Sequence, residues 1–395
     1  MRRMLLLAVA GIAVVFVVAG AARPAGSVQP SRWVIRDLGT LPGVQASEAV
    51  AINESGQVIG TYRRTVKAAD GTPYGRAFLW ENGRMRDLGT LGGRQSQVVA
   101  INAKGQIVGW SETKAGSRHA FLWENGRMRD LGTLFGGFSE AVEINDQGQV
   151  VGLSDTKTKG GKIRHGVRHA FLWQNGSMRD LGTLGGAGIV GPYGPPGSKA
   201  LAINEYGQVV GGSRTTKTDE SHAFLWQDGT MTDLGKPEEW LDSWATAVNN
   251  QGQIVGGGGA EDWFLWENGK MSNLATLPGT MNPQPVAINE SGEVVVRCDT
   301  YQRTPCAFVW QNGKRINLGT YANAINDHGQ VVGANYTSSQ WRAFLWEKGK
   351  RTVLDPLPGG KARDASDIND NGQIVGSSYT KYGAVHAVLW TLRSG

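Results

Sequence analysis

The sequence predicts an all-β fold: a single eight-bladed β-propeller of four-stranded blades, closed by pairing of the N-terminal strand with the last blade. Three observations predict it. Two phrases recur together eight times, each copy carries the turn signals of antiparallel hairpins, and the chain begins with a strand that its last copy lacks. Repeats of about 40 to 45 residues built from short strands are typical of propeller blades.

The repeated unit is defined by two phrases, which read "AINESGQVIG" and "RAFLW" in the first copy. The second phrase ends in a Trp that recurs at intervals of 36 to 53 residues, and the first phrase precedes every copy of it. The Trp series is Trp80, Trp123, Trp173, Trp226, Trp266, Trp310, Trp346 and Trp390. The Asn series is Asn53, Asn102, Asn145, Asn204, Asn249, Asn289, Asn326 and Asn369. Because both series are complete, the unit occurs eight times.

Turn residues divide each unit into four short strands. Asn-Gly follows the Trp in most units, and both residues tolerate the positive φ that a two-residue hairpin turn requires. The Asn-x-x-Gly of the first phrase suits a type I turn with Gly in the left-handed position, and β-branched residues follow it. In the first unit the expected strands are therefore 47–53, 57–62, 76–80 and 84–91.

The two ends of the chain fit one ring. The last unit stops at "HAVLWTLRSG" and lacks a fourth strand, whereas Val34–Leu41, "VIRDLGTL", is a fourth strand with no unit before it. Pairing this segment with the last third strand closes the ring and removes the exposed edges that an open array leaves.

"HAFLW" followed by Asn-Gly and "DLGTLGG", with "AIN..GQVVG" before it, resembles the HAF family of probable extracellular repeats. The resemblance covers about residues 33–390. It implies an exported repeat protein of unassigned biochemical role and transfers no catalytic residue. The family's His stands at His119, His169, His222 and His386, and other units carry Arg76, Arg342, Cys306 and, in the fifth, an "EDW" ending at Trp263.

The N-terminal segment differs in composition from the rest. Two arginines precede an apolar, uncharged run from Met4 to Ala22, and Ala19-Gly20-Ala21 offers a small-x-small cleavage pattern. We expect residues 1–22 to be a signal peptide or an N-terminal membrane anchor, 23–32 a linker, and 33–395 the propeller. Either form places the propeller in the extracellular space or the cell envelope, with membrane contact only through an uncleaved anchor.

The composition limits the classes of partner. Charged residues make up 19% and hydrophobic residues 40%, so the chain can bury a core. The formal net charge of +6 is too small to imply nucleic-acid binding. We expect a monomer with no nucleic-acid partner.

Most residues that could carry chemistry have a structural interpretation. The eight Asn side chains are expected to bond backbone groups of their own turns, and the repeated Trp and Phe rings to fill the space between blades. "DINDNG" from Asp367 resembles the start of a calcium loop, but Ser378 stands where that loop needs a carboxylate. One His per blade does not converge on an ion, and no G-x-S-x-G or H-E-x-x-H motif occurs. We predict no catalytic residue, no metal ligand and no cofactor.

The connections between second and third strands, and those between units, vary in length and are expected to share one face. Variable loops on a rigid scaffold commonly bind ligands. Loop cations and tryptophans outside the repeat predict a site for an anionic glycan or cell-envelope polymer. The candidate binding residues are Trp240, Trp244, Trp263, Arg63, Arg64, Lys162 and Arg164. Cys298 and Cys306 flank one such loop and are expected to form a disulfide in an exported chain.

The sequence thus favours an exported, non-catalytic binding or adhesion scaffold that recognises carbohydrate. Two alternatives stay open, because fold does not fix function. One is an exported polysaccharide lyase or hydrolase built on a propeller, and the other is a purely structural envelope protein.

Overall fold

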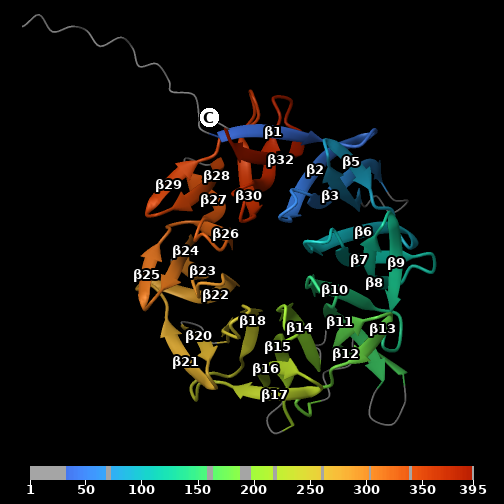
Figure 1. The fold of residues 1–395 in the computed structure, drawn as a ribbon, viewed down its shortest axis with the longest axis vertical. Coiled ribbons are helices and arrows are strands. Elements are labelled where there is room, and N and C mark those ends of the chain that lie inside the picture. Colours follow the sequence, from blue (N-terminus) through green and yellow to red (C-terminus); the bar gives the residue numbers. More distant parts are fainter. Residues whose placement is uncertain are drawn as a thin grey trace, which may run out of the picture. The chain divides into compact units, whose positions relative to one another are not determined.

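The computed structural model describes residues 33–67, 73–157, 163–186, 197–216, 220–258, 262–301, 304–337 and 340–393. Within these ranges the chain forms four-stranded antiparallel sheets that follow one another around a ring (Figure 1). There are eight such sheets, so the predicted eight-bladed propeller is confirmed. None of the described residues belongs to a helix long and apolar enough to cross a membrane.

Each blade is a meander of consecutive strands. Blade 1 comprises β2 (Val44–Ile52), β3 (Val58–Lys67), β4 (Pro73–Glu81) and β5 (Arg84–Asp87). Blade 2 comprises β6 (Gly92–Ile101), β7 (Ile107–Thr113), β8 (Arg118–Glu124) and β9 (Arg127–Gly132). Blade 3 comprises β10 (Ser139–Ile144), β11 (Val150–Lys157), β12 (Ile163–Gln174) and β13 (Ser177–Asp180). Blade 4 comprises β14 (Ser198–Ile203), β15 (Val209–Arg214), β16 (Ser221–Gln227) and β17 (Thr230–Gly235).

The second half repeats this arrangement. Blade 5 comprises β18 (Trp244–Val248), β19 (Ile254–Gly257), β20 (Asp262–Glu267) and β21 (Lys270–Ala275). Blade 6 comprises β22 (Thr280–Ile288), β23 (Val294–Thr300), β24 (Pro305–Gln311) and β25 (Lys314–Asn317). Blade 7 comprises β26 (Tyr321–Ile325), β27 (Val331–Thr337), β28 (Gln340–Glu347) and β29 (Lys350–Val353). Blade 8 comprises β30 (Ala362–Ile368), β31 (Ile374–Tyr379), β32 (Val385–Leu392) and, from the other end of the chain, β1 (Trp33–Gly39).

Blade 8 closes the ring as the sequence predicts. Strand β1 pairs antiparallel with β32, with Ile35 opposite Trp390 and Asp37 opposite Val388. Figure 1 shows β1 at the outer edge of this blade, where β5 and β9 lie in blades 1 and 2. The first strand of each blade lies nearest the centre of the ring.

The hydrophobic core lies between neighbouring blades. Between blades 1 and 2, for example, Leu79 packs in one cluster with Phe121 and Trp123 of the next blade. The repeated Phe is fully buried at Phe78, Phe121, Phe171, Phe224, Phe264, Phe308 and Phe344. The second strand carries a glycine opposite the repeated phenyl ring. In blade 1, a Cβ on Gly60 would lie 2.1 Å from the Glu48 carbonyl oxygen and 2.5 Å from the Phe78 ring. The expected filling of the space between blades by repeated aromatic rings is thus observed.

The turn residues take the predicted backbone conformations. Asn82 and Gly83 both have positive φ, at 49° and 79°. Unit seven adopts the same conformation with Lys348 in place of Asn, at a φ of 48°. The repeat therefore imposes the turn even where the favoured residue is missing.

The repeated Asn residues join the blades as well as their own turns. Asn53 Oδ1 accepts the Gln57 backbone N–H, as the sequence predicts, while its Nδ2 donates to the carbonyl oxygen of Asn102 in the next blade. The same bond recurs at 2.9 to 3.1 Å for every pair, and Asn369 of blade 8 donates to Asn53 of blade 1. These eight bonds form a closed ring of hydrogen bonds, which the sequence analysis did not predict.

Candidate functional site

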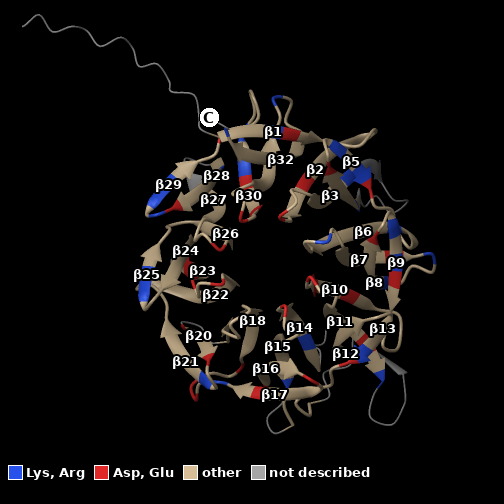
Figure 2. Cartoon of the chain, viewed as in Figure 1, with Lys and Arg blue, Asp and Glu red and all other residues tan. Residues whose placement is uncertain are grey.

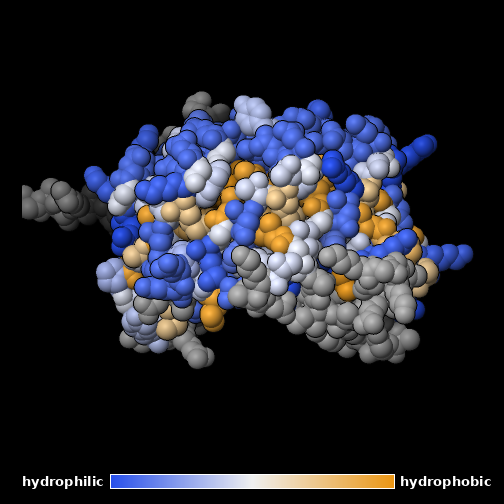
Figure 3. Space-filling model, turned by 90° about the horizontal axis from the view of Figure 1, so that it is seen from below, coloured by the Kyte–Doolittle hydropathy of each residue, from blue (hydrophilic) through white to orange (hydrophobic). Residues whose placement is uncertain are grey.

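The meander gives the ring two different faces. The turns that join first to second strands and third to fourth strands lie on one face, called here the uniform face. The loops that join second to third strands, and one blade to the next, lie on the other, called here the variable face. Figure 3 shows one side of the rim, where hydrophilic residues gather along an edge and a more hydrophobic band lies beside them.

Most of the predicted loop cations lie beyond the side chains that the structure describes. Arg63 is exposed on β3 of blade 1. Lys162 lies outside the described residues, and so do the side chains of Arg64 and Arg164. In blade 2, Arg118 lies 3.8 Å from the Trp110 ring centroid and pairs with Glu140. Arg118 is thus engaged with an aromatic and an acidic side chain.

Two of the three predicted tryptophans are buried, which corrects their assignment to a binding surface. Trp263 has no exposed surface and packs edge-on against Trp310, with centroids 5.9 Å apart. Trp240 is 6% exposed and packs against Phe264. A buried ring has no free face for a ligand. Only Trp244, 40% exposed, stays accessible, and blade 5 lies across the ring from Arg63.

The burial of Trp263 has a signal in the sequence. In the phrase "DWFLW" it takes the position that Ala120 holds in "HAFLW", and that Ala is fully buried. Asp262 takes the His position and accepts a hydrogen bond from Asn273 at 3.0 Å. Aligning the phrases by strand register would have assigned Trp263 to the core.

The repeated His residues have a structural role within the blades. His119 Nδ1 lies 2.9 Å from Asp130 Oδ2, and because a carboxylate only accepts, the imidazole N–H donates. The same pair joins His169 to Asp180, His222 to Asp233 and His386 to Asp37. Burial would raise the pKa of Asp180, but hydrogen bonds from His169, Gly182 and Thr156 and the His169 charge outweigh it and lower that pKa.

In four blades a serine lies opposite the His on the neighbouring strand. Ser, His and Asp therefore lie close together, but the serine is not placed to act as a nucleophile. Ser111 pairs with His119 in the β7–β8 register. Ser111 Oγ is fully buried, donates to the Gln95 carbonyl oxygen and accepts the Leu91 N–H. A hydroxyl held by backbone groups in this way is not presented to a base.

Acidic residues gather at the turns nearest the centre of the ring (Figure 2). Their carboxylates accept backbone N–H groups of the preceding blade, as Glu54 Oε1 does from Asp370 N at 3.0 Å. Within the part of the chain that the structure describes, no group of three or more His, Cys, Asp or Glu is placed to hold a metal ion. These carboxylates therefore contribute to the joints between blades.

A cleft with a volume of about 520 Å³ lies on the variable face between blades 7 and 8. Its walls come from the start of β28, the loop before β30 and the hairpin after β31. We call it the blade 7/8 cleft; its lining includes Gln340, Trp341, Gly360, Lys361, Tyr379 and Lys381. None of these residues was a candidate from the sequence.

Aromatic rings from both blades line the blade 7/8 cleft. Trp341 is 39% exposed and lies 5.5 Å from Tyr321, centroid to centroid. Tyr379 is 37% exposed, and its N–H donates to the Lys361 carbonyl oxygen at 2.8 Å. A Cβ on Gly360 would lie 1.7 Å from the Tyr379 carbonyl oxygen, so only glycine allows the two loops to approach. The position of Tyr379 in the cleft is therefore fixed by backbone contacts with the loop before β30.

Cations border these rings. Lys361 and Lys381 both line the cleft, and Lys381 Nζ lies 4.7 Å from the centroid of Tyr382, which is 84% exposed. Arg342 and Asp355 line an adjoining hollow of about 180 Å³. Three cations against one carboxylate make this region favourable for an anion.

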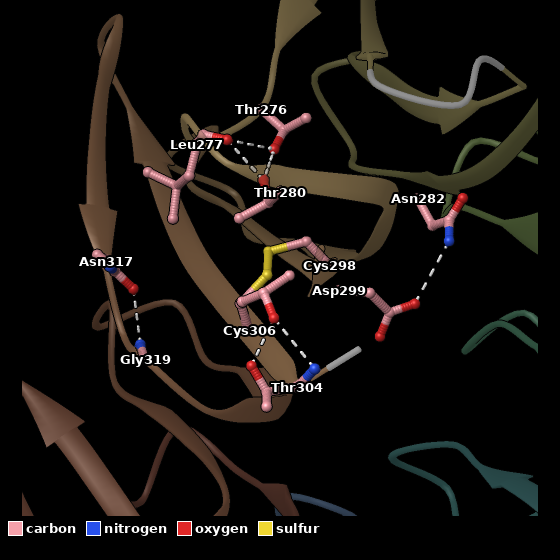
Figure 4. The surroundings of a disulfide bond; sticks show 11 residues. Thr276, Leu277, Thr280, Asn282, Cys298, Asp299, Thr304, Cys306, Asn317 and Gly319 are labelled. Carbon is pink, nitrogen blue, oxygen red and sulfur yellow. Dashed lines mark hydrogen bonds between the residues drawn. A yellow bond between two sulfur atoms is a disulfide. The ribbon is translucent and has the colours of Figure 1, made fainter. Parts of the chain in front are cut away.

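The cysteines are joined by a disulfide within blade 6 (Figure 4). Cys298 on β23 lies opposite Cys306 on β24, at the register where Ser111 faces His119 in blade 2. Both cysteines are buried beside Trp263. The bond takes the place of a Ser and His pair of the repeat.

Comparisons with known proteins bear on the fold. A family model described as "Protein of unknown function (DUF3466)" matches residues 139–270, from the start of blade 3 to the start of β21. No curated protein matches. Among solved structures, a prolyl endopeptidase is 11% identical with a TM-score of 0.53, and the match covers 89% of this chain and 55% of that one.

Two further structures are similar at lower scores. The β-propeller domain of the Trilobed protease from Pyrococcus furiosus is 9% identical, with a TM-score of 0.49 and coverage of 89% and 95%. Oligogalacturonate lyase in complex with manganese is 11% identical, with a TM-score of 0.49 and coverage of 91% and 93%. At 11% identity, the similarity to the prolyl endopeptidase concerns the fold alone and leaves the activity of this chain open.

Proposed function

We propose that the protein is an exported, non-catalytic β-propeller scaffold of the HAF repeat type that binds an anionic glycan or cell-envelope polymer. The main support for this proposal is the blade 7/8 cleft, which is lined by partly exposed aromatic rings and by lysines. A sugar ring stacks its C–H face on an aromatic side chain and a uronate or sulfate pairs with an ammonium group. The ligand enters from the variable face.

The engagement of the repeat's polar side chains supports binding over catalysis. The His, Ser and Asp of the repeat bond one another or the backbone. An enzyme that cleaves glycans needs two free carboxylates or a base within reach of the bond. Of the cleft linings described above, only Asp355 offers a carboxylate.

The test is a glycan array that contains uronic-acid, sulfated and matched neutral glycans. We expect the wild type to bind anionic glycans, with binding that weakens as salt rises. Trp341→Ala should weaken binding about tenfold or more, as loss of one stacking contact implies. Lys361→Ala with Lys381→Ala should abolish the preference for anionic over neutral glycans.

Trp244→Ala is the matched control, since Trp244 is equally exposed but lies in blade 5. It should leave binding unchanged. Binding lost in Trp244→Ala and kept in Trp341→Ala would place the site at blade 5 instead. Absence of binding to every anionic glycan, or release of shortened glycan during incubation, would contradict the proposal.

A further inference from the structure

A second cleft lies on the uniform face between blades 3 and 4, with a volume of about 390 Å³. We call it the blade 3/4 cleft; its lining includes Gln149, Gln174, Ser177, Arg179, Tyr206, Trp226 and Asp228. We propose that it binds a neutral sugar ring. This site is separate from the blade 7/8 cleft, which lies on the opposite face.

At the equivalent position of other blades, the Gln that follows the Asn-x-x-Gly turn donates a hydrogen bond to the Glu that follows the repeated Trp. Gln106 Nε2 donates to Glu124 Oε2 at 2.8 Å in blade 2, and the same bond joins Gln57 to Glu81 in blade 1. Blades 5 and 7 repeat it at Gln253–Glu267 and Gln330–Glu347. In these four blades the amide donor is thus satisfied within the protein.

Blade 3 departs from this pattern. Gln174 stands at the acceptor position, as Gln227 does in blade 4. Gln208 Nε2 donates to Gln227 Oε1 at 3.1 Å in blade 4, whereas Gln149 Nε2 has no hydrogen-bond partner among the described residues. Its Oε1 accepts from Asn145 Nδ2 at 2.7 Å, which fixes the amide so that Nε2 lines the cleft. Gln149 is only 8% exposed. The Gln149 amide donor is therefore open to the cleft, where a ligand or water can supply its acceptor.

Two further departures open the cleft and give it an aromatic wall. After the Asn-Gly turn, Ser177 stands where blades 1 and 2 carry Arg84 and Arg127. Tyr206 stands at a turn position that is Ser55 in blade 1, and it is 70% exposed. The turn is held by Tyr206 N donating to the Asn204 side chain. The ring is therefore presented on a rigid support.

The polar groups around the cleft suit a neutral ligand. Arg179 lies 5.2 Å from the Trp226 ring centroid, which holds its guanidinium in place, and Asp228 offsets its charge. The carboxylate of Glu205, next to Tyr206, already accepts the Asp146 N–H. Amide, hydroxyl and guanidinium donors, one carboxylate acceptor and an exposed ring together match the hydroxyls and C–H face of a pyranose.

The test is calorimetric titration of the full-length protein with glucose, galactose, mannose and N-acetylglucosamine and their disaccharides. We expect at least one of them to bind in the millimolar range. Tyr206→Ser, which restores the residue of blade 1, should weaken binding about tenfold. Gln174→Glu should abolish it, because the new carboxylate accepts from Gln149 Nε2 as Glu124 does from Gln106.

The Gln174→Glu variant restores a pair that the protein already uses, so its melting temperature should equal or exceed that of the wild type. Tyr206→Ser decides the question if that variant fails to fold. Trp341→Ala should bind the neutral sugar normally, which separates this site from the blade 7/8 cleft. No binding of any neutral sugar at millimolar concentration, or binding unchanged by both substitutions, would overturn the proposal.

Discussion

Glu143 makes the stability of the ring depend on pH. It stands on β10 at a position where six blades carry alanine: Ala51, Ala100, Ala202, Ala247, Ala287 and Ala324. Glu143 Oε2 accepts the Ile203 N–H of the next blade at 2.8 Å. Burial raises the pKa of Glu143 to about 7, the charge of Glu205 adds to the rise, and the bond from Ile203 opposes it.

The direction of the pH effect follows from this raised pKa. Between pH 4.5 and about 7 the folded protein holds a proton that the unfolded chain releases. The contribution of Glu143 to the free energy of unfolding therefore falls as pH rises through this window and is constant above it. A rise in pKa from 4.5 to about 7 corresponds to about 3 kcal/mol of stability lost at pH 8.

Glu143→Gln removes the charge and keeps an oxygen that can accept the Ile203 N–H. Urea unfolding followed by tryptophan fluorescence should give equal stabilities for variant and wild type at pH 4, and a variant more stable by about 3 kcal/mol at pH 8. The exposed Glu239→Gln is the control and should change neither value. A difference between Glu143→Gln and wild type that is the same at both pH values would refute the reasoning.

Three further substitutions probe the frame. Asn102→Ala should lower the free energy of unfolding by about 2–4 kcal/mol in urea, because buried backbone groups of two blades lose their hydrogen-bond partner. Lys104→Ala in the same turn is the control and should have little effect. Trp263→Ala should cost about 3–5 kcal/mol and leave glycan binding unchanged, a result that any loss of binding would contradict. Reducing the bond between Cys298 and Cys306 should lower stability by about 2–3 kcal/mol, measured as a drop in melting temperature with dithiothreitol, since the loop it closes is short.

The ring could be predicted from the sequence because its determinants are local and repeated. Asn-Gly and Asn-x-x-Gly specify turns through backbone conformations that few other residues tolerate. The unpaired strand at Val34–Leu41 and the missing strand after Trp390 then allow one closure. The repetition of these signals outweighs an exception such as Lys348.

The binding residues could not be chosen in the same way, because exposure depends on neighbours far along the chain. Trp263 replaces the small alanine of the repeated phrase and is buried against blade 6. Trp341 lies at the start of β28 yet is partly exposed, and it lines the same cleft as Tyr379 of the next blade. Composition cannot separate these two rings, since only packing between blades determines which of them reaches solvent.

The sequence by itself determined the number of blades, their strands and turns, and the seam between the two ends of the chain, because each of these follows from contacts within one unit or its neighbour. Tertiary structure alone decided the ring of Asn bonds, the raised pKa of Glu143 and the two clefts. Each of these arises where side chains of adjacent blades meet, and their distances are set only when the whole ring has closed.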